Sequence, residues 1–161
     1  MPAQNTHVAT PEVVISAESG HRGAIAEWVA TFAGLWAAPA QQLDRIMDIF
    51  GADIRLVAPG YVPTVGREAG RQAFAKTLAA LPDLTGQVLR WSAQGEVLFV
   101  EMTFEATIGG RRVRWHNVDR FLFREGYAVE RVAYFNPTKV RLAFLSSFKG
   151  IRQFMKLRWG R

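Results

Sequence analysis

The first half of the chain repeats its apolar residues at steps of three and four, which is the period of an amphipathic α-helix. Each repeating segment is followed closely by a proline or a glycine, the residues that commonly end helices. The pattern predicts helices over residues 22–36, 43–50 and 67–81. Residues 54–58 are expected to form a short strand, and residues 61–65 a loop or hairpin.

Beyond Pro82 the period changes to two, so that successive side chains face opposite sides, as in a β-strand. The predicted strands are residues 88–92, 96–108, 112–124 and 127–135. Each strand is separated from the next by a short turn that contains glycine. Such spacing implies an antiparallel meander. Helices followed by a curled sheet define an α+β fold whose helices cover one face of the sheet.

Length and composition indicate one globular domain with a charged C-terminal segment. The chain has 161 residues, of which 49% are hydrophobic and 21% charged. Its net charge of +6 is unevenly placed. Residues 139–161 carry seven basic side chains and no acidic one, whereas residues 1–138 hold 13 Lys and Arg against 14 Asp and Glu. The body of the domain is therefore nearly neutral.

The basic segment is also apolar, and we predict a C-terminal helix over residues 139–161. Five residues fall on one stripe of it: Val140, Phe144, Phe148, Ile151 and Met155. The stripe can pack on the domain or on a second copy of the chain, or it can lie on an anionic membrane surface. Nucleic acid is not the expected partner, because the neutral body offers no basic groove and no recognition motif.

Several classes of site are excluded or disfavoured by composition. The chain has no cysteine, which removes disulfides, thiolate metal sites and cysteine nucleophiles. Three histidines are too few for a histidine-rich metal site, and we expect neither metal nor cofactor. The first 20 residues form a loose arm without the pattern of a signal peptide. No apolar run approaches the length of a membrane span. We therefore expect a cytoplasmic protein, with the basic helix as its one feature suited to a membrane surface.

Three stretches of sequence carry a resemblance to a known superfamily over residues 22–138. They are DIFGADIRLVAPG, GREAGRQAFAKTLAALPD and NVDRFLFREGYAVERVAYFNP. In this order and spacing they resemble the nuclear-transport-factor-2-like superfamily, which includes SnoaL-type polyketide cyclases and ketosteroid isomerase. The resemblance implies a cone: a curved antiparallel sheet of four to six strands wrapped around three N-terminal helices. The expected domain is residues 21–138, with the C-terminal helix as an extension.

The resemblance also implies a deep apolar pocket lined by the concave face of the sheet. With Asp119 facing inward, strand alternation places Trp115, Asn117 and Phe121 on the same face, whereas His116 faces outward. Matching to the isomerase adds further inward positions on the other strands and the first helix. The predicted ligand-binding residues are Trp28, Ala58, Val100, Met102, Phe104, Trp115, Asn117, Phe121, Arg131 and Phe135.

Asp119 is the predicted catalytic residue. It resembles the aspartic acid with which ketosteroid isomerase donates a hydrogen bond to a substrate oxygen, a carboxyl that its apolar site keeps protonated. The alternative is a buried ion pair between Asp119 and an inward Arg131. The superfamily's proton acceptors are missing, because the isomerase base falls at Ala58, and those of the SnoaL cyclases and of limonene-epoxide hydrolases both fall at Ala133.

The resulting expectation is a pocket for a small hydrophobic, oxygen-bearing molecule such as a steroid, terpenoid or polyketide fragment. If the protein is an enzyme, the reaction is cofactor-free acid–base chemistry of the isomerase, cyclase or dehydratase type. The alternative is a non-catalytic ligand-binding or dimerisation module. A homodimer is expected from the habit of the superfamily, with an outward row that includes Phe99 as its surface.

Overall fold

The computed structural model of the protein describes residues 19–159. The predicted arm at residues 1–20 lies outside them except for its last two residues. The N-terminal helical elements are α1 (Ser19–Trp36), a short 3-10 turn η1 (Pro39–Gln41), α2 (Leu43–Asp48) and α3 (Arg67–Ala80). The strands are β1 (Phe50–Val57), β2 (Thr64–Val65), β3 (Thr85–Gln94), β4 (Val97–Ile108), β5 (Arg111–Arg124) and β6 (Tyr127–Tyr134). The helices α1, α2 and α3 precede the strands β3–β6, as the hydrophobic pattern predicts, whereas β1 and β2 lie between α2 and α3.

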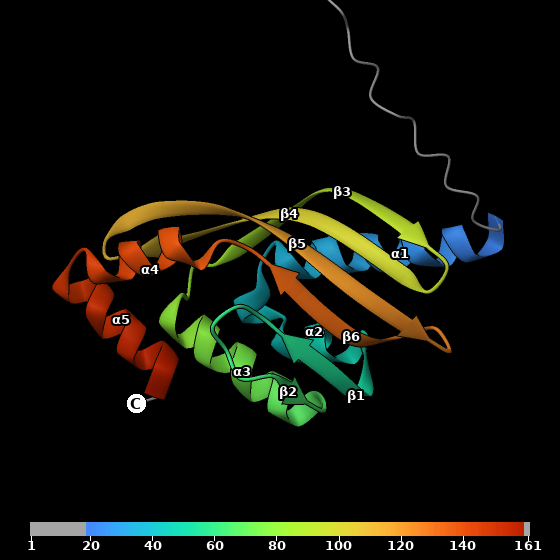
Figure 1. Cartoon of the computed structure of the whole chain (residues 1–161), viewed down its shortest axis with the longest axis horizontal. Coiled ribbons are helices and arrows are strands. Elements are labelled where there is room, and N and C mark those ends of the chain that lie inside the picture. The colour runs from blue at the N-terminus through green and yellow to red at the C-terminus, as the bar shows by residue number, and fades with distance from the viewer. Residues whose placement is uncertain (1–18, 160–161) are drawn as a thin grey trace, which may run out of the picture.

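The six strands form one curved sheet in the order β2-β1-β6-β5-β4-β3. Figure 1 shows the long strands β3–β6 arching over α1, α2 and α3. The α+β cone predicted from the sequence is confirmed. Consecutive strands from β3 to β6 pair antiparallel, whereas β1 lies parallel to β6. This pairing places the end of β1 beside Arg131 of β6, because Leu56 is its register partner.

Aromatic side chains join the helices to the sheet. Phe32 of α1, Phe50 of β1 and Phe121 of β5 are all fully buried. The Phe32 ring lies 5.3 Å from the Phe121 ring and 5.2 Å from the ring of Trp28. Large rings packed edge-on or stacked contribute both buried area and favourable ring geometry. The helical stripe of α1 therefore packs against part of the concave side of the sheet.

The two-residue alternation assigns the faces of the sheet correctly. On β5, Asn117, Asp119 and Phe121 are buried, whereas His116 is exposed on the outer face. On β4, every second side chain from Leu98 to Ile108 is buried. The inward orientation predicted for Asp119 is confirmed.

Most element boundaries differ from the prediction by a few residues, and two of the differences have a visible cause. The second helix ends at Asp48, and Phe50 begins β1, paired with Ala128 of β6. Phe50 fits the helical spacing of α2, and it is also buried as the first residue of a strand. The local pattern therefore does not distinguish a helical from a strand conformation at Phe50. Strand β3 begins at Thr85, because residues 85–87 already pair with β4, and Gly86 leaves room for the ring of Phe104.

The C-terminal segment forms two helices, α4 (Pro137–Leu145) and α5 (Phe148–Trp159), instead of the single helix predicted over residues 139–161. The break resets the helical register, so the predicted stripe does not exist as one face. Phe144 is buried, but Phe148 is 94% exposed. The side of α5 that packs inward carries Gly150, Phe154 and Leu157 instead.

Polar contacts and a close glycine contact hold α5 on the cone. The Gln153 amide donates to the carbonyls of Ala80 and Thr107 and accepts from the backbone N–H of Gly109. Gly150 lies against the last turn of α4, so that a Cβ there would overlap the carbonyl of Phe144. Figure 1 shows the helical pair at one end of the molecule, beside α3. Among the helices that the structure describes, none is long and apolar enough to cross a membrane.

We expect Gly150→Ala to destabilise the fold by about 1–3 kcal/mol, because α4 and α5 have to move apart. Gly34→Ala in α1 is the matched control. Nothing lies within 4 Å of a Cβ at Gly34, so alanine there is expected to be neutral or stabilising by up to about 1 kcal/mol. Urea unfolding of both variants measures the difference. Equal midpoints would contradict the close contact.

Candidate functional site

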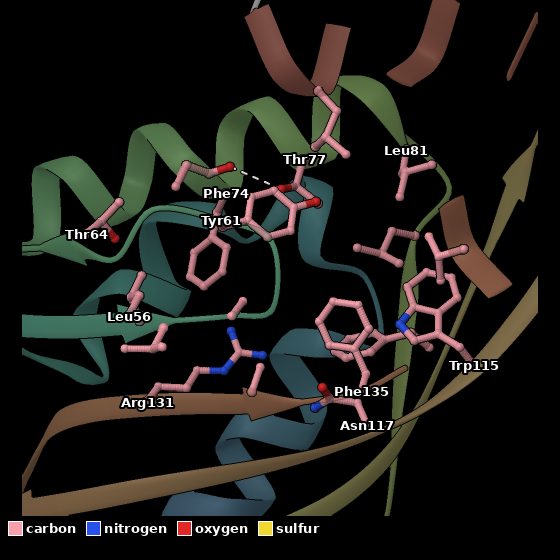
Figure 2. Close-up of a pocket in the computed structure, with 18 of the residues that line it drawn as sticks. Leu56, Tyr61, Thr64, Phe74, Thr77, Leu81, Trp115, Asn117, Arg131 and Phe135 are labelled. Atoms are coloured by element: carbon pink, nitrogen blue, oxygen red, sulfur yellow. Dashed lines mark hydrogen bonds between the residues drawn. The ribbon is translucent and has the colours of Figure 1, made fainter. Parts of the chain in front are cut away.

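A cavity of about 240 Å³ lies between the concave face of the sheet, α3 and the C-terminal helices. In Figure 2, Arg131 and Asn117 rise from the sheet on one side, and Thr77 and Leu81 lie on the other. Most of the wall is apolar. Its lining residues are Trp36, Leu56, Val57, Ala58, Tyr61, Val62, Thr64, Ala73, Phe74, Thr77, Leu81, Leu84, Phe104, Trp115, Asn117, Arg131, Ala133, Phe135, Val140, Phe144 and Leu157.

Beneath the pocket, a buried ion pair joins the two strands β5 and β6. Arg131 Nη2 donates to Asp119 Oδ2 at 2.7 Å, and Asp119 is fully buried. The Arg131 guanidinium lies 5.2 Å from the ring centroid of Trp36 and 5.5 Å from that of Phe74. Arg131 lines the pocket and Asp119 does not. The pair is neutral as a unit, so the site offers the hydrogen-bonding groups of an arginine without a net charge.

Several buried polar atoms in the pocket wall have no hydrogen-bond partner in the described part of the chain. They include three N–H donors, Arg131 Nε, Asn117 Nδ2 and Trp36 Nε1, together with the hydroxyl of Thr64. The three donor residues are all less than a tenth exposed. Buried polar groups are nearly always paired in folded proteins, so unpaired donors on three residues of one pocket wall favour a ligand that carries a hydrogen-bond acceptor.

Six of the predicted ligand-binding residues line the pocket: Ala58, Phe104, Trp115, Asn117, Arg131 and Phe135. The other four do not, because α1 covers the central part of the sheet. Val100, Met102 and Phe121 are completely buried in the core. Trp28 stacks on Phe32 and donates its indole N–H to the carbonyl of Ile49. Its one polar group is thereby used within the fold.

The structure places Asp119 beneath the pocket wall, and Asp119 is not one of the residues that line the pocket. Its Oδ2 accepts a hydrogen bond from Arg131, whereas its Oδ1 is buried without a hydrogen-bond partner among the described residues. Within the described part of the chain, no Asp, Glu, His or Lys side chain lines the pocket. The titratable groups that do are Arg131 and Tyr61. Burial raises the pKa of the Tyr61 hydroxyl, although Arg158 and Arg141 act in the opposite direction. Tyr61 is therefore a donor at neutral pH.

Other residues of the site were not predicted. Trp36 ends the apolar stripe of α1 and reaches the pocket because α1 packs across the sheet. Val140, Phe144 and Leu157 of the C-terminal helices complete the wall. Val140 and Phe144 belong to the predicted stripe, for which packing on the domain was one alternative, whereas Leu157 lies outside that stripe. Among the described residues, no group of three or more His, Cys, Asp or Glu side chains is placed to hold a metal ion.

Asp119→Asn is expected to lower the free energy of unfolding by about 3–5 kcal/mol, because it leaves the buried Arg131 charge unpaired. The double variant Asp119→Leu/Arg131→Met removes both charges and should recover most of that loss. Asp44→Asn breaks an exposed pair with Arg71 and should leave the unfolding midpoint unchanged. Urea denaturation measures the free energy of unfolding of the three variants and of the wild-type protein. A fully stable Asp119→Asn protein would show that the pair does not hold the site together.

Comparison with known proteins places this pocket in a known fold. A candidate SnoaL-like polyketide cyclase from Jannaschia sp. CCS1 superposes with a TM-score of 0.68 at 17% identity, covering 75% of this chain and 91% of that one. A protein with a ketosteroid isomerase-like fold from Catenulispora acidiphila DSM 44928, in complex with trimethylamine, superposes with a TM-score of 0.65 at 18% identity. The match covers 71% of this chain and 88% of that one.

TerC, co-crystallised with polyporic acid, gives a TM-score of 0.64 at 18% identity, covering 78% of this chain and 98% of that one. At such identities the likeness concerns the fold alone. No curated protein sequence is significantly similar to the chain. Residues 25–131, most of the chain, match the SnoaL-like domain. The protein therefore belongs to the SnoaL-like family.

Proposed function

We propose that the protein binds a small, mainly apolar molecule that carries a hydrogen-bond-accepting oxygen, and that it does so without acid–base catalysis. The observation that carries this proposal is the cluster of unpaired buried donors on Arg131, Asn117 and Trp36 in an otherwise apolar wall. An unsatisfied buried donor costs about 1–3 kcal/mol. A ligand oxygen that accepts from these groups removes that cost, and apolar contact supplies the rest of the affinity.

The size of the cavity narrows the ligand class. About 240 Å³ lies just below the range of about 300–1,000 Å³ that is usual for pockets holding drug-sized molecules. A ligand of one or two rings, such as a terpenoid or a polyketide fragment, is therefore a better fit than a steroid. TerC, with the same fold, has been crystallised with an organic oxygen-bearing compound, polyporic acid, which supports this class of ligand.

The pocket chemistry argues against an isomerase, cyclase or dehydratase of the acid–base type. Such reactions need a group that accepts a proton within hydrogen-bond reach of the substrate. Asp119, the carboxylate predicted from the sequence for acid–base chemistry, is paired with Arg131 beneath the wall. The pocket side chains of the described residues polarise an oxygen but remove no proton. A binding protein is the function that this arrangement supports best.

A second property concerns the location of the protein, which we propose to be an anionic membrane surface reached through α5. The outward side of this helix carries the exposed Phe148, Ile151 and Met155. Lys149, Arg152 and Lys156 are exposed between them. No acidic residue occurs from Asn136 to Arg161. Apolar side chains flanked by cations suit the interface of an anionic bilayer.

The predicted homodimer stays a proposal. Phe99 of β4 and Tyr134 of β6 are exposed on the outer face of the sheet. This face is where the superfamily resemblance places a dimer contact. Size-exclusion chromatography with light scattering reports the mass directly, and it serves as a control in the membrane experiment below.

Binding of paired probes tests the ligand class. We expect 1-tetralone to bind about tenfold more tightly than tetralin, its parent hydrocarbon, because only the ketone satisfies the buried donors. Asn117→Leu should remove most of this preference and leave tetralin binding unchanged. Thr103→Val, on the outer face of the sheet, is the control. Quenching of Trp36 and Trp115 fluorescence measures both affinities. Equal affinities for the two probes, or binding of neither, would contradict the proposal.

Vesicle sedimentation tests the membrane surface. We expect the protein to bind phosphatidylglycerol vesicles in preference to phosphatidylcholine vesicles, and the preference to fall with salt, because each cation near the surface contributes about 1 kcal/mol. Replacing Phe148, Ile151 and Met155 with serine should abolish binding. Phe99→Ser should not. If the triple variant binds vesicles like the wild-type protein but has a lower mass in light scattering, the apolar side of α5 contacts a second copy of the chain instead of a membrane.

A further inference from the structure

A second cavity of about 280 Å³ adjoins the ligand pocket. It lies between the loop after β1 and the helices α4 and α5, and it shares five wall residues with the first cavity: Tyr61, Phe135, Val140, Phe144 and Leu157. The second cavity differs from the first in its charge. Arg141 of α4 and Arg158 of α5 line it, and they do not line the ligand pocket.

Neither arginine has a carboxylate partner in the part of the chain that the structure describes. Among the described residues, no carboxylate forms a salt bridge with Arg141 or Arg158, and no Asp or Glu lines this cavity. Most arginines of the sheet, by contrast, form salt bridges with carboxylates, as Arg112 and Arg114 do with Glu105. Guanidinium groups lying together at a cavity without a carboxylate leave several N–H donors for an anion.

The loop after β1 is shaped to receive these two side chains. Gly60 has a φ of 81°, in the left-handed region, and a Cβ there would collide with the Arg141 guanidinium. Arg158 Nη1 donates to the carbonyl of Gly60 at 3.4 Å. The two guanidinium groups, from different helices, therefore converge on one glycine. The hydroxyl of Tyr61, the next residue, lies within the electrostatic influence of both arginines.

The geometry points to an amphipathic organic anion as the ligand: its mainly apolar part, which carries the accepting oxygen, occupies the first cavity, and its carboxylate or phosphate is held by Arg141, Arg158 and Tyr61 in the second. This inference rests on the proposed ligand-binding function and specifies its substrate class. A planar guanidinium donates two parallel hydrogen bonds to a carboxylate or phosphate, which is why paired arginines select such groups. Because the Asp119–Arg131 pair has no net charge, the negative charge of the ligand is recognised only in the second cavity, by Arg141 and Arg158.

The experiment compares decanoate, decyl phosphate and decan-1-ol, which share one alkyl chain, below their micelle concentrations. Tryptophan fluorescence and isothermal titration calorimetry give the affinities. We expect at least one of the two anions to bind about 10–100-fold more tightly than the alcohol, as charge-assisted hydrogen bonds suggest. Which of them binds more tightly distinguishes a carboxylate ligand from a phosphate ligand.

Two variants separate this site from a general effect of charge. Arg141→Gln/Arg158→Gln should reduce the anion preference to within about threefold and leave the alcohol unaffected. Lys149→Gln/Arg152→Gln also removes two positive charges, but from the outward side of α5, and should keep the preference for the anions. Gly60→Ala keeps every charge but displaces the Arg141 guanidinium, so it should also weaken anion binding. Circular dichroism verifies that each variant is folded.

The outcomes distinguish the two proposals. If all three probes bind equally to the wild-type protein, or if the control variant loses the preference as well, the anion site is wrong and the apolar pocket stands. If none of the probes binds and the paired ketone and hydrocarbon also fail, the proposed ligand-binding function fails with it. If only the anions bind, and Arg141→Gln/Arg158→Gln abolishes that binding, the two cavities act as one site.

Discussion

The buried pair of Asp119 and Arg131 is the constraint around which the rest of the molecule is arranged. Two charges removed from water are tolerated only when they are close and well oriented. The pair therefore requires β5 and β6 to keep their register. Arg131 also lies over Trp36 of α1 and Phe74 of α3, so the helices meet the sheet at the same place. The chemistry of the pocket follows from this pair, because it supplies donors without a net charge or a free carboxylate.

The positive charge of the protein acquires distinct positions once the C-terminal segment is folded. Arg141 and Arg158 turn toward the cavity beside Gly60, whereas Lys149, Arg152 and Lys156 are exposed on α5. The segment is therefore not a uniformly basic tail. One side of it completes the pocket wall through Phe144 and Leu157, and the other presents cations and apolar side chains to the surroundings. The proposed ligand site and the proposed membrane surface thus lie on opposite sides of one helical pair.

Membership of the SnoaL-like family does not determine the chemistry, because the same cone carries different sites. The positions at which the resemblance places proton acceptors hold Ala58 and Ala133 in this chain, and both line the pocket as plain apolar wall. Trp28, which the resemblance places among the ligand-binding residues, donates its indole N–H to the carbonyl of Ile49 instead. In this chain the pocket of the cone carries its unpaired donors on Arg131, Asn117 and Trp36.

The sequence by itself determined the features that depend on neighbouring residues. Alternation along β4 and β5 placed Asn117, Asp119 and Phe121 on the buried face, because the side-chain period of a strand is set locally. Alternation does not tell which inward residues reach the cavity. Only the packing of α1 decided that Val100, Met102 and Phe121 belong to the core.

The break between α4 and α5 likewise depends on contacts outside the segment, such as those of Gln153 with Ala80 and Thr107. Local hydrophobic periodicity carries no information about such contacts, so the predicted single helix and its stripe were wrong. The meeting of Arg158 with Gly60 joins residues 98 positions apart. The sequence therefore determined which face each strand residue takes. The tertiary structure decided which of those residues form a site, because a site is made where distant segments pack together.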